Sequence, residues 1–138
     1  MNQKREVKLK KIVEEVGLQV INRPANFNDI TINAPAISRP GMQLAGFYEY
    51  FDANRIQLIG KVETAYLQGF TTDVRKEKIE KLMETDIPAL IVCHSVDVMP
   101  ECIEAARKYN ITLLKTNMRT EELMVVLVSF LKDKIIHI

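Results

Sequence analysis

The second half of the chain alternates between short apolar stretches and longer amphipathic ones, and this alternation constrains the fold more than any other feature. Short runs of Ile, Leu and Val are typical of buried strands, whereas apolar residues repeating every three or four positions are typical of helices. Strands that alternate with helices predict an α/β fold, with a largely parallel sheet flanked by helices. We expect strands at 55–60, 87–94 and 111–117, and helices at 61–70, 71–86, 100–110 and 120–133.

The first half of the chain is less regular. A helical stripe of apolar residues runs from Val7 to Val16, and a short strand is expected at 18–22. A second strand is expected at 29–37, where Pro35 favours the edge or the end of a strand because proline cannot donate to a neighbour. In parallel sheets, ligands lie at the carboxyl ends of the strands, so loops at those ends are the first places to search for a site.

The segment AISRPGMQLAGFYEYF shows neither the alternation typical of a strand nor the repeat of three or four residues typical of a helix. Pro40 fixes its own φ and Gly41 frees the next, so the residues from Ser38 to Gly41 are predicted to form a tight corner. Arg39 is expected to pair there with a carboxylate or a carbonyl, at about the strength of an exposed ion pair. The cluster that follows is expected in the core or at a subunit interface: Met42, Leu44, Phe47, Tyr48, Tyr50 and Phe51.

Composition narrows the class of protein. The 138 residues are 47% hydrophobic and 27% charged, which suits one compact domain. A net charge of +1 gives no general affinity for nucleic acid or anionic membranes, and neither is an expected partner. No apolar run has the length of a membrane span and no signal peptide is recognisable. With only two cysteines, a cytoplasmic protein with reduced thiols is expected.

Known catalytic patterns are missing from the sequence. Neither form of glycine-rich phosphate loop occurs. Cys93, His94, Asp97 and Cys102 are ligand types, but their spacing matches no structural zinc pattern. Two packed thiols and a loop histidine are therefore expected, with no metal site and no catalytic residue in this chain.

One group of residues is a candidate for ligand binding: Ser38, Arg39, Lys61 and Thr64. An arginine beside a hydroxyl is able to hold an anion, and Lys61 and Thr64 begin a helix after a strand. The structural alternatives remain open. In those, Ser38 caps the turn, Arg39 makes a salt bridge, and Glu63 complements the positive end of the helix.

The central block of the sequence resembles the amino-terminal domain of HPr kinase/phosphorylase. The resemblance covers nearly the whole chain, to about Lys134, and includes the later segment IPALIVCHSVDVMPECIEAARKYNITLLKTNMRT. The matching motifs are Ser38-Arg39-Pro40-Gly41, Leu44-Ala45-Gly46-Phe47, Tyr50-Phe51 and Arg55-Ile56-Gln57-Leu58-Ile59-Gly60-Lys61 with Glu63.

The resemblance implies a fold similar to the amino-terminal domains of the Mur ligases. It also implies a cytoplasmic enzyme that phosphorylates a serine of the phosphocarrier HPr, in carbon catabolite control, and reverses the modification. ATP or pyrophosphate and magnesium are expected only in a separate P-loop domain, through which HPr binds. The family's full protein is typically a hexamer, so other copies of the chain are expected partners.

The resemblance further implies a division of the chain. Residues 1–134 correspond to the amino-terminal domain, and 135–138 to the start of a linker toward a catalytic domain that is absent here. His137 precedes the position of the family's catalytic histidine and is given no catalytic role.

Two functions follow from these observations. The first is a non-catalytic domain for assembly or regulation in a bifunctional HPr serine kinase/phosphorylase. The alternative is a stand-alone regulatory module that binds a small molecule or an anion. An apolar surface around residues 47–51 favours the first, and a pocket lined with the four candidate residues favours the second.

Overall fold

The computed structural model describes residues 6–135 of the chain. Of the expected linker at 135–138, Ile135 is the last residue of a helix and is buried, and residues 136–138, with His137, lie outside the described residues. No helix between residues 6 and 135 has the length and hydrophobicity needed to cross a membrane. The elements follow one another as β1 (Val7–Lys8), α1 (Leu9–Val16), β2 (Gln19–Asn22), a 3-10 turn (Phe27–Asp29), β3 (Thr31–Ile32), β4 (Ile37–Ser38), α2 (Gly41–Leu44), β5 (Ile56–Ile59), α3 (Lys61–Gln68), α4 (Thr72–Met83), β6 (Leu90–Val92), α5 (Pro100–Tyr109), β7 (Leu113–Lys115) and α6 (Thr120–Ile135).

The main sheet has five strands in the order β2-β7-β6-β5-β4. The four strands from β4 to β7 are mutually parallel, and β2 pairs antiparallel with β7 at one edge. A separate two-stranded antiparallel pair joins β1 and β3. The expected α/β fold with a largely parallel sheet is confirmed.

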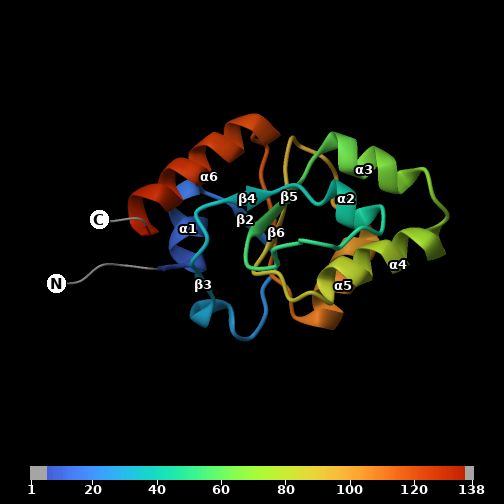
Figure 1. Cartoon of the computed structure of the whole chain (residues 1–138), viewed down its shortest axis with the longest axis horizontal. Coiled ribbons are helices and arrows are strands. Elements are labelled where there is room, and N and C mark those ends of the chain that lie inside the picture. Colours follow the sequence, from blue (N-terminus) through green and yellow to red (C-terminus); the bar gives the residue numbers. More distant parts are fainter. Residues whose placement is uncertain (1–5, 136–138) are drawn as a thin grey trace.

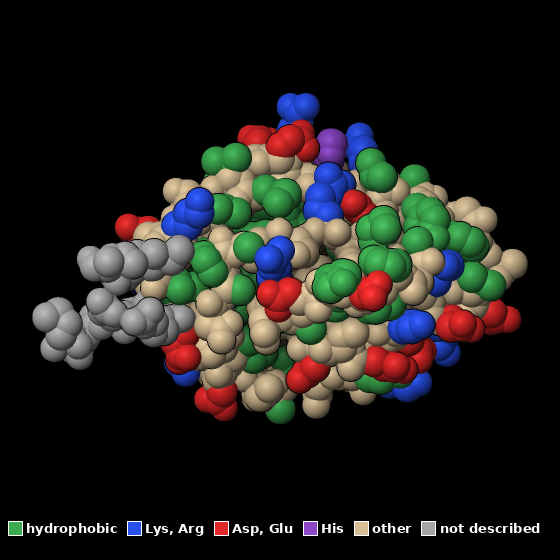
Figure 2. Space-filling model, in the orientation of Figure 1, with side chains coloured by type: hydrophobic (Ala, Val, Ile, Leu, Met, Phe, Trp, Pro, Cys, Tyr) green, Lys and Arg blue, Asp and Glu red, His purple; other side chains and the backbone are tan. Residues whose placement is uncertain are grey.

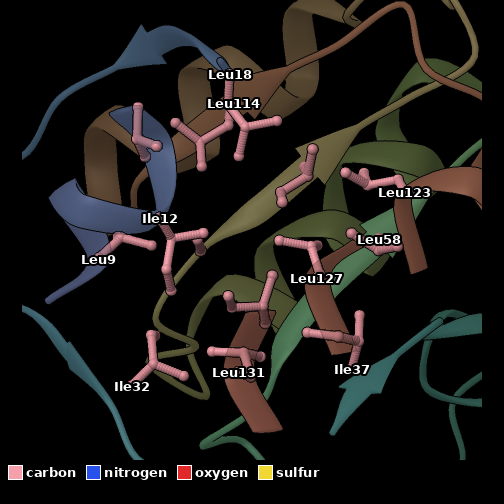
Figure 3. Close-up of a cluster of buried hydrophobic side chains, with 14 of the residues drawn as sticks. Leu9, Ile12, Leu18, Ile32, Ile37, Leu58, Leu114, Leu123, Leu127 and Leu131 are labelled. Carbon is pink, nitrogen blue, oxygen red and sulfur yellow. The ribbon is translucent and has the colours of Figure 1, made fainter. Parts of the chain in front are cut away.

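Helices cover the sheet on both faces (Figure 1). Helices α1 and α6 pack on one face, and residues of α2, α3, α4 and α5 form the core on the other. Strand β5 illustrates the period of two, since Ile56 and Leu58 point into the first core and Ile59 into the second. In the first core, leucines of α1 and α6 meet those of the strands (Figure 3): Leu9, Leu58, Leu114, Leu123, Leu127 and Leu131.

The expected order of elements from residue 55 onward is confirmed, and both cysteines are buried and free. The prediction of one strand at 29–37 is wrong, because this stretch divides into β3 and the edge strand β4. Pro35 lies between the two and has no N–H to continue a ladder. Val7 also departs from the expected helix, since it pairs with Ile32 in the small sheet.

The predicted corner is present between Ser38 and Gly41, but the role given to Gly41 is wrong, because Gly41 starts a helix and its φ is not positive. Strand β4 ends at Ser38, and the short helix α2, which the sequence pattern did not predict, begins at Gly41. The glycine with a left-handed backbone is Gly46, at a φ of 103°. This positive φ lets the chain leave α2 sharply and enter the aromatic segment.

Candidate functional site

The carboxyl ends of the parallel strands bring together polar groups that are far apart in the sequence. Strand β4 ends beside Arg39, β5 ends beside Gly60, and β6 is followed by Cys93. Helices α3 and α6 start at the same edge and supply Glu63 and Thr120. Because ligands of such sheets bind at this edge, these five residues define the region in which a site is expected.

Arg39 and Glu63 form the most ordered contact at this edge. The guanidinium donates from Nε to Oε2 at 2.9 Å and from Nη2 to Oε1 at 3.0 Å. Glu63 also accepts a 2.8 Å bond from the backbone N–H of Gly60, which caps the start of α3. Its side chain is only 7% exposed, against 37% for Arg39. The expected pairing of Arg39 with a carboxylate is confirmed, but its partner is a buried one.

The protonation of Glu63 reflects this geometry. Burial raises the pKa of its carboxyl, whereas the bonds from Arg39 and from backbone N–H groups lower it, and the net pKa lies below the usual value. The same contact raises the pKa of Arg39. Both groups are therefore charged at neutral pH and hold each other in place.

Gly60 is enclosed at the same edge. A Cβ atom built on it would lie 2.5 Å from Oγ1 of Thr120, whose residue is only 3% exposed. That hydroxyl is 3.2 Å from Sγ of Cys93, which donates to the carbonyl of Ile59 at 3.2 Å. Burial raises the pKa of the Cys93 thiol, so this cysteine packs as a neutral thiol at physiological pH.

The four residues of the predicted ligand site are dispersed. Ser38 accepts a 3.5 Å bond from Arg55, and Arg39 is bound to Glu63. Lys61 is exposed on the first turn of α3, and Thr64 is 5% exposed with no hydrogen-bond partner among the described residues for its hydroxyl. Ser38 and Arg39 line one hollow, and Lys61 and Thr64 lie outside its lining.

This hollow has a volume of about 250 Å³ and lies beside the corner. Sequence reasoning singled out its first two residues but missed the others. The signal for them was the Asp-Ala-Asn turn before β5, which returns Arg55 to the side of β4. The hollow is lined with Ser38, Arg39, Met42, Gln43, Tyr50, Phe51, Asp52 and Arg55.

A separate apolar surface covers α2, α3 and the start of α4. Figure 2 shows hydrophobic side chains gathered on the right of the molecule, where Figure 1 draws α2 and α3. Lys78 links these elements, because its ammonium donates to the Leu44 carbonyl at 3.2 Å and lies 4.7 Å from the Phe70 ring centroid. The exposed Met42 of α2 lines the hollow instead. We define this surface by four exposed side chains on or next to these elements: Phe47 (45%), Val62 (70%), Tyr66 (38%) and Val74 (41%).

The aromatic segment from Phe47 to Phe51 divides between core and solvent. Tyr48 and Phe51 pack edge to face at 5.7 Å against the second core, whereas Phe47 is half exposed and Tyr50 is 94% exposed. The expected place in the core is confirmed for Tyr48 and Phe51, and a place at a subunit interface stays a prediction for Phe47 and Tyr50.

We expect Tyr48→Phe to stabilise the domain by up to about 1 kcal/mol, because the Tyr48 hydroxyl is buried without a partner among the described residues. Burial, and next Glu84, raise the pKa of Tyr48 to about 12. An unfolded tyrosine ionises near pH 10, so the wild type should lose stability, relative to the variant, as the pH rises from 10 toward 12. Urea unfolding at pH 7 and pH 11 measures this difference. Tyr50→Phe is the control, since a stabilisation of similar size there would contradict the explanation.

The fold and the contacts at this edge together define a class of protein. It is a three-layer α/β domain in which several polar groups at the carboxyl edge of the sheet form hydrogen bonds with one another. Within residues 6–135, no three His, Cys, Asp or Glu side chains are grouped so as to hold a metal ion. Comparison with known families is more specific. The family described as HPr Serine kinase N terminus matches residues 7–131, and the chain belongs to that family.

Similar curated proteins agree with this family. HPr kinase/phosphorylase of Clostridium perfringens strain 13 is 36% identical over 128 residues, which are 93% of this chain and 41% of that protein. HPr kinase/phosphorylase of Alkaliphilus metalliredigens is 35% identical over 127 residues, or 92% of this chain and 41% of its own length. The chain thus spans about two fifths of the length of these relatives.

A solved structure shares the fold. It contains the CBS and DRTGG domains of the regulatory region of Clostridium perfringens pyrophosphatase, complexed with the activator diadenosine tetraphosphate. The match has a TM-score of 0.62 and 19% identity, and covers 88% of this chain and 46% of that one. At this identity the similarity concerns the fold.

Proposed function

We propose that this chain is the non-catalytic assembly and regulatory domain of a bifunctional HPr serine kinase/phosphorylase that controls carbon catabolite repression in the bacterial cytoplasm. Membership of the HPr serine kinase N-terminal family supports this function. The observation that carries the assembly role is the apolar surface of Phe47, Val62, Tyr66 and Val74, which is costly to leave in water.

The remaining parts of the proposal concern the longer protein. HPr would bind a separate catalytic domain, which would use ATP or pyrophosphate with magnesium. Residues 1–134 would form the amino-terminal domain, with a fold related to that of the Mur ligases, and the linker would start at 135. Copies of the chain would associate as parts of a hexamer.

The alternative, a stand-alone module that binds an anion through the four candidate residues, has less support. Only Ser38 and Arg39 of the four line the hollow, and Lys61 and Thr64 lie outside it. An anion at this edge would therefore require a different set of residues from the four proposed.

Self-association through the apolar surface is testable with two valines of equal exposure. Val62 on α3 and Val125 on α6 are both 70% exposed and belong to helices on opposite faces of the sheet. We expect the wild-type chain to self-associate in sedimentation velocity, and Val62→Glu to weaken association at least tenfold by burying a carboxylate in the contact. Val125→Glu should sediment as the wild type does.

Two outcomes would contradict the assembly role. A wild-type chain that remains a monomer up to several hundred micromolar has no such contact. A Val125→Glu variant as impaired as Val62→Glu would mean that any added charge disrupts the assembly. Circular dichroism of both variants checks that they remain folded.

A further inference from the structure

The hollow beside the corner has the chemistry of a small ligand site. It is bounded by the end of β4, helix α2 and the loop that leads to β5. Its volume, about 250 Å³, lies just below the range of drug-sized pockets, so it has room for a phosphate group and a small part of a larger ligand. Its polar lining includes two guanidinium groups, a hydroxyl and an amide, from Arg39, Arg55, Ser38 and Gln43.

Both arginines keep guanidinium donors that no described residue accepts, but only Arg39 is held firmly. Arg39 binds Glu63 through Nε and Nη2, and no described residue accepts a hydrogen bond from its Nη1. Arg55 is held more loosely, since its Nη1 donates to Ser38 at 3.5 Å and its Nε lies 3.4 Å from Asp52 without making a hydrogen bond. The Arg39 guanidinium is therefore ordered before an anion arrives, which lowers the entropy lost on binding, and Arg55 has donors left for the same anion.

The carboxylates around the hollow limit the affinity that charge alone can give for an anion. Asp52 lines it and Glu63 lies behind Arg39, so the two arginines face two carboxylates. The net charge is close to zero, and an isolated anion would gain little. A ligand of useful affinity must therefore make a second, uncharged contact.

Tyr50 offers that contact. This residue lines the hollow and is 94% exposed, and its φ of 66° lies in the left-handed region that a bulky residue rarely adopts. Strained residues of this kind concentrate at binding sites, and an exposed tyrosine ring stacks favourably on the flat face of a nucleobase. Met42, 61% exposed, lines the same hollow and provides further apolar area.

We propose that this hollow binds a nucleoside monophosphate. The phosphate enters the hollow and accepts hydrogen bonds from Arg39 and Arg55, while the base stays outside and stacks on Tyr50. This site is separate from the apolar surface of the assembly proposal and does not depend on it.

Isothermal titration calorimetry of the chain with AMP, adenosine and inorganic phosphate tests the site. We expect AMP to bind at least tenfold more tightly than either phosphate or adenosine, because only AMP satisfies both halves of the site. Arg55→Gln should weaken AMP at least tenfold, and Tyr50→Gly, which also relieves the positive φ, should weaken AMP about fivefold while leaving phosphate unchanged. Arg107→Gln, an exposed arginine on α5, is the matched control and should bind AMP as the wild type does.

Three results would overturn the proposal: no heat of binding with millimolar AMP, equal affinity for AMP and inorganic phosphate, or equal losses in Arg55→Gln and Arg107→Gln. Sedimentation separates this test from that of the assembly role. Arg55→Gln should associate as the wild type does, and Val62→Glu should bind AMP with unchanged affinity.

Discussion

Replacing Gly60 with alanine is expected to destabilise the domain by about 2–3 kcal/mol. The new methyl group would lie 2.5 Å from Oγ1 of Thr120, a distance at which one of the two must move. Neither is free to move, because the N–H of Gly60 binds Glu63 and the Thr120 hydroxyl lies against Cys93. Urea unfolding followed by circular dichroism measures the loss.

A second substitution identifies the cause of that loss. Thr120→Ala removes the clashing oxygen, so the double variant Gly60→Ala/Thr120→Ala should be less destabilised than the sum of the two single variants. Gly41→Ala serves as the control, because its Cβ would meet no atom within 4 Å and its φ is not positive. Equal stability of Gly60→Ala and Gly41→Ala would show that the edge has room for a side chain.

Replacing Arg39 with alanine is expected to cost about 2–3 kcal/mol at pH 7, several times the cost expected for an exposed ion pair. The substitution leaves the carboxylate of Glu63, 7% exposed, without its charged partner. The control is Arg119→Ala, since Arg119 and Glu121 form a pair with side chains 66% and 72% exposed. That variant should lose no more than about 0.5 kcal/mol.

The loss should depend on pH in a defined direction. In the wild type the pKa of Glu63 is lowered, so its contribution is present above the unfolded pKa and decreases as the pH falls through the folded pKa. Without Arg39, burial becomes the dominant cause and raises the pKa of Glu63. Protonation of Glu63 then removes the buried charge from the variant. The difference in the free energy of unfolding between the variant and the wild type should therefore shrink between pH 7 and pH 4.

The double variant Arg39→Ala/Glu63→Gln separates charge from packing. The amide oxygen still accepts from the N–H of Gly60, but no charge is buried, so its loss of stability should be smaller than that of Arg39→Ala and constant with pH. A loss in Arg39→Ala that stays the same at pH 4 would mean that Glu63 is not the source of the effect.

These two contacts also bear on function. They satisfy the Glu63 carboxylate and the backbone N–H of Gly60 at the carboxyl edge of β5 without any ligand, whereas the hydroxyl of the neighbouring Thr64 has no partner among the described residues. The adjacent hollow at the edge strand β4 keeps guanidinium donors free, and it is the hollow in which we propose that a ligand binds.

The sequence alone determined the local structure of this protein. The continuous apolar run of IPALIVCH and the helical period after Thr71 depend on neighbouring residues only. Both predicted elements are present, the helix at 72–83 instead of 71–86, and the strand at 90–92, which is shorter than the expected 87–94. The corner at Pro40 and the burial of both cysteines follow in the same way, from backbone restriction and from low polarity.

Only the tertiary structure decided which distant residues meet. The stretch 29–37 has a strand pattern throughout. In the folded chain only β4 joins the main sheet, by pairing with β5, whereas β3 pairs with β1 in the small sheet. The sequence predicted an acceptor for Arg39 but did not identify it. The parallel pairing of β4 with β5 brings Arg39 next to Glu63, 24 residues away in the sequence. No sequence pattern around Gly60 requires a glycine. The requirement comes from Thr120 at the start of α6, because the Thr120 hydroxyl would lie 2.5 Å from a Cβ atom on residue 60. Periodicity acts between neighbours in the sequence, whereas register and packing act between segments that meet only in the folded chain.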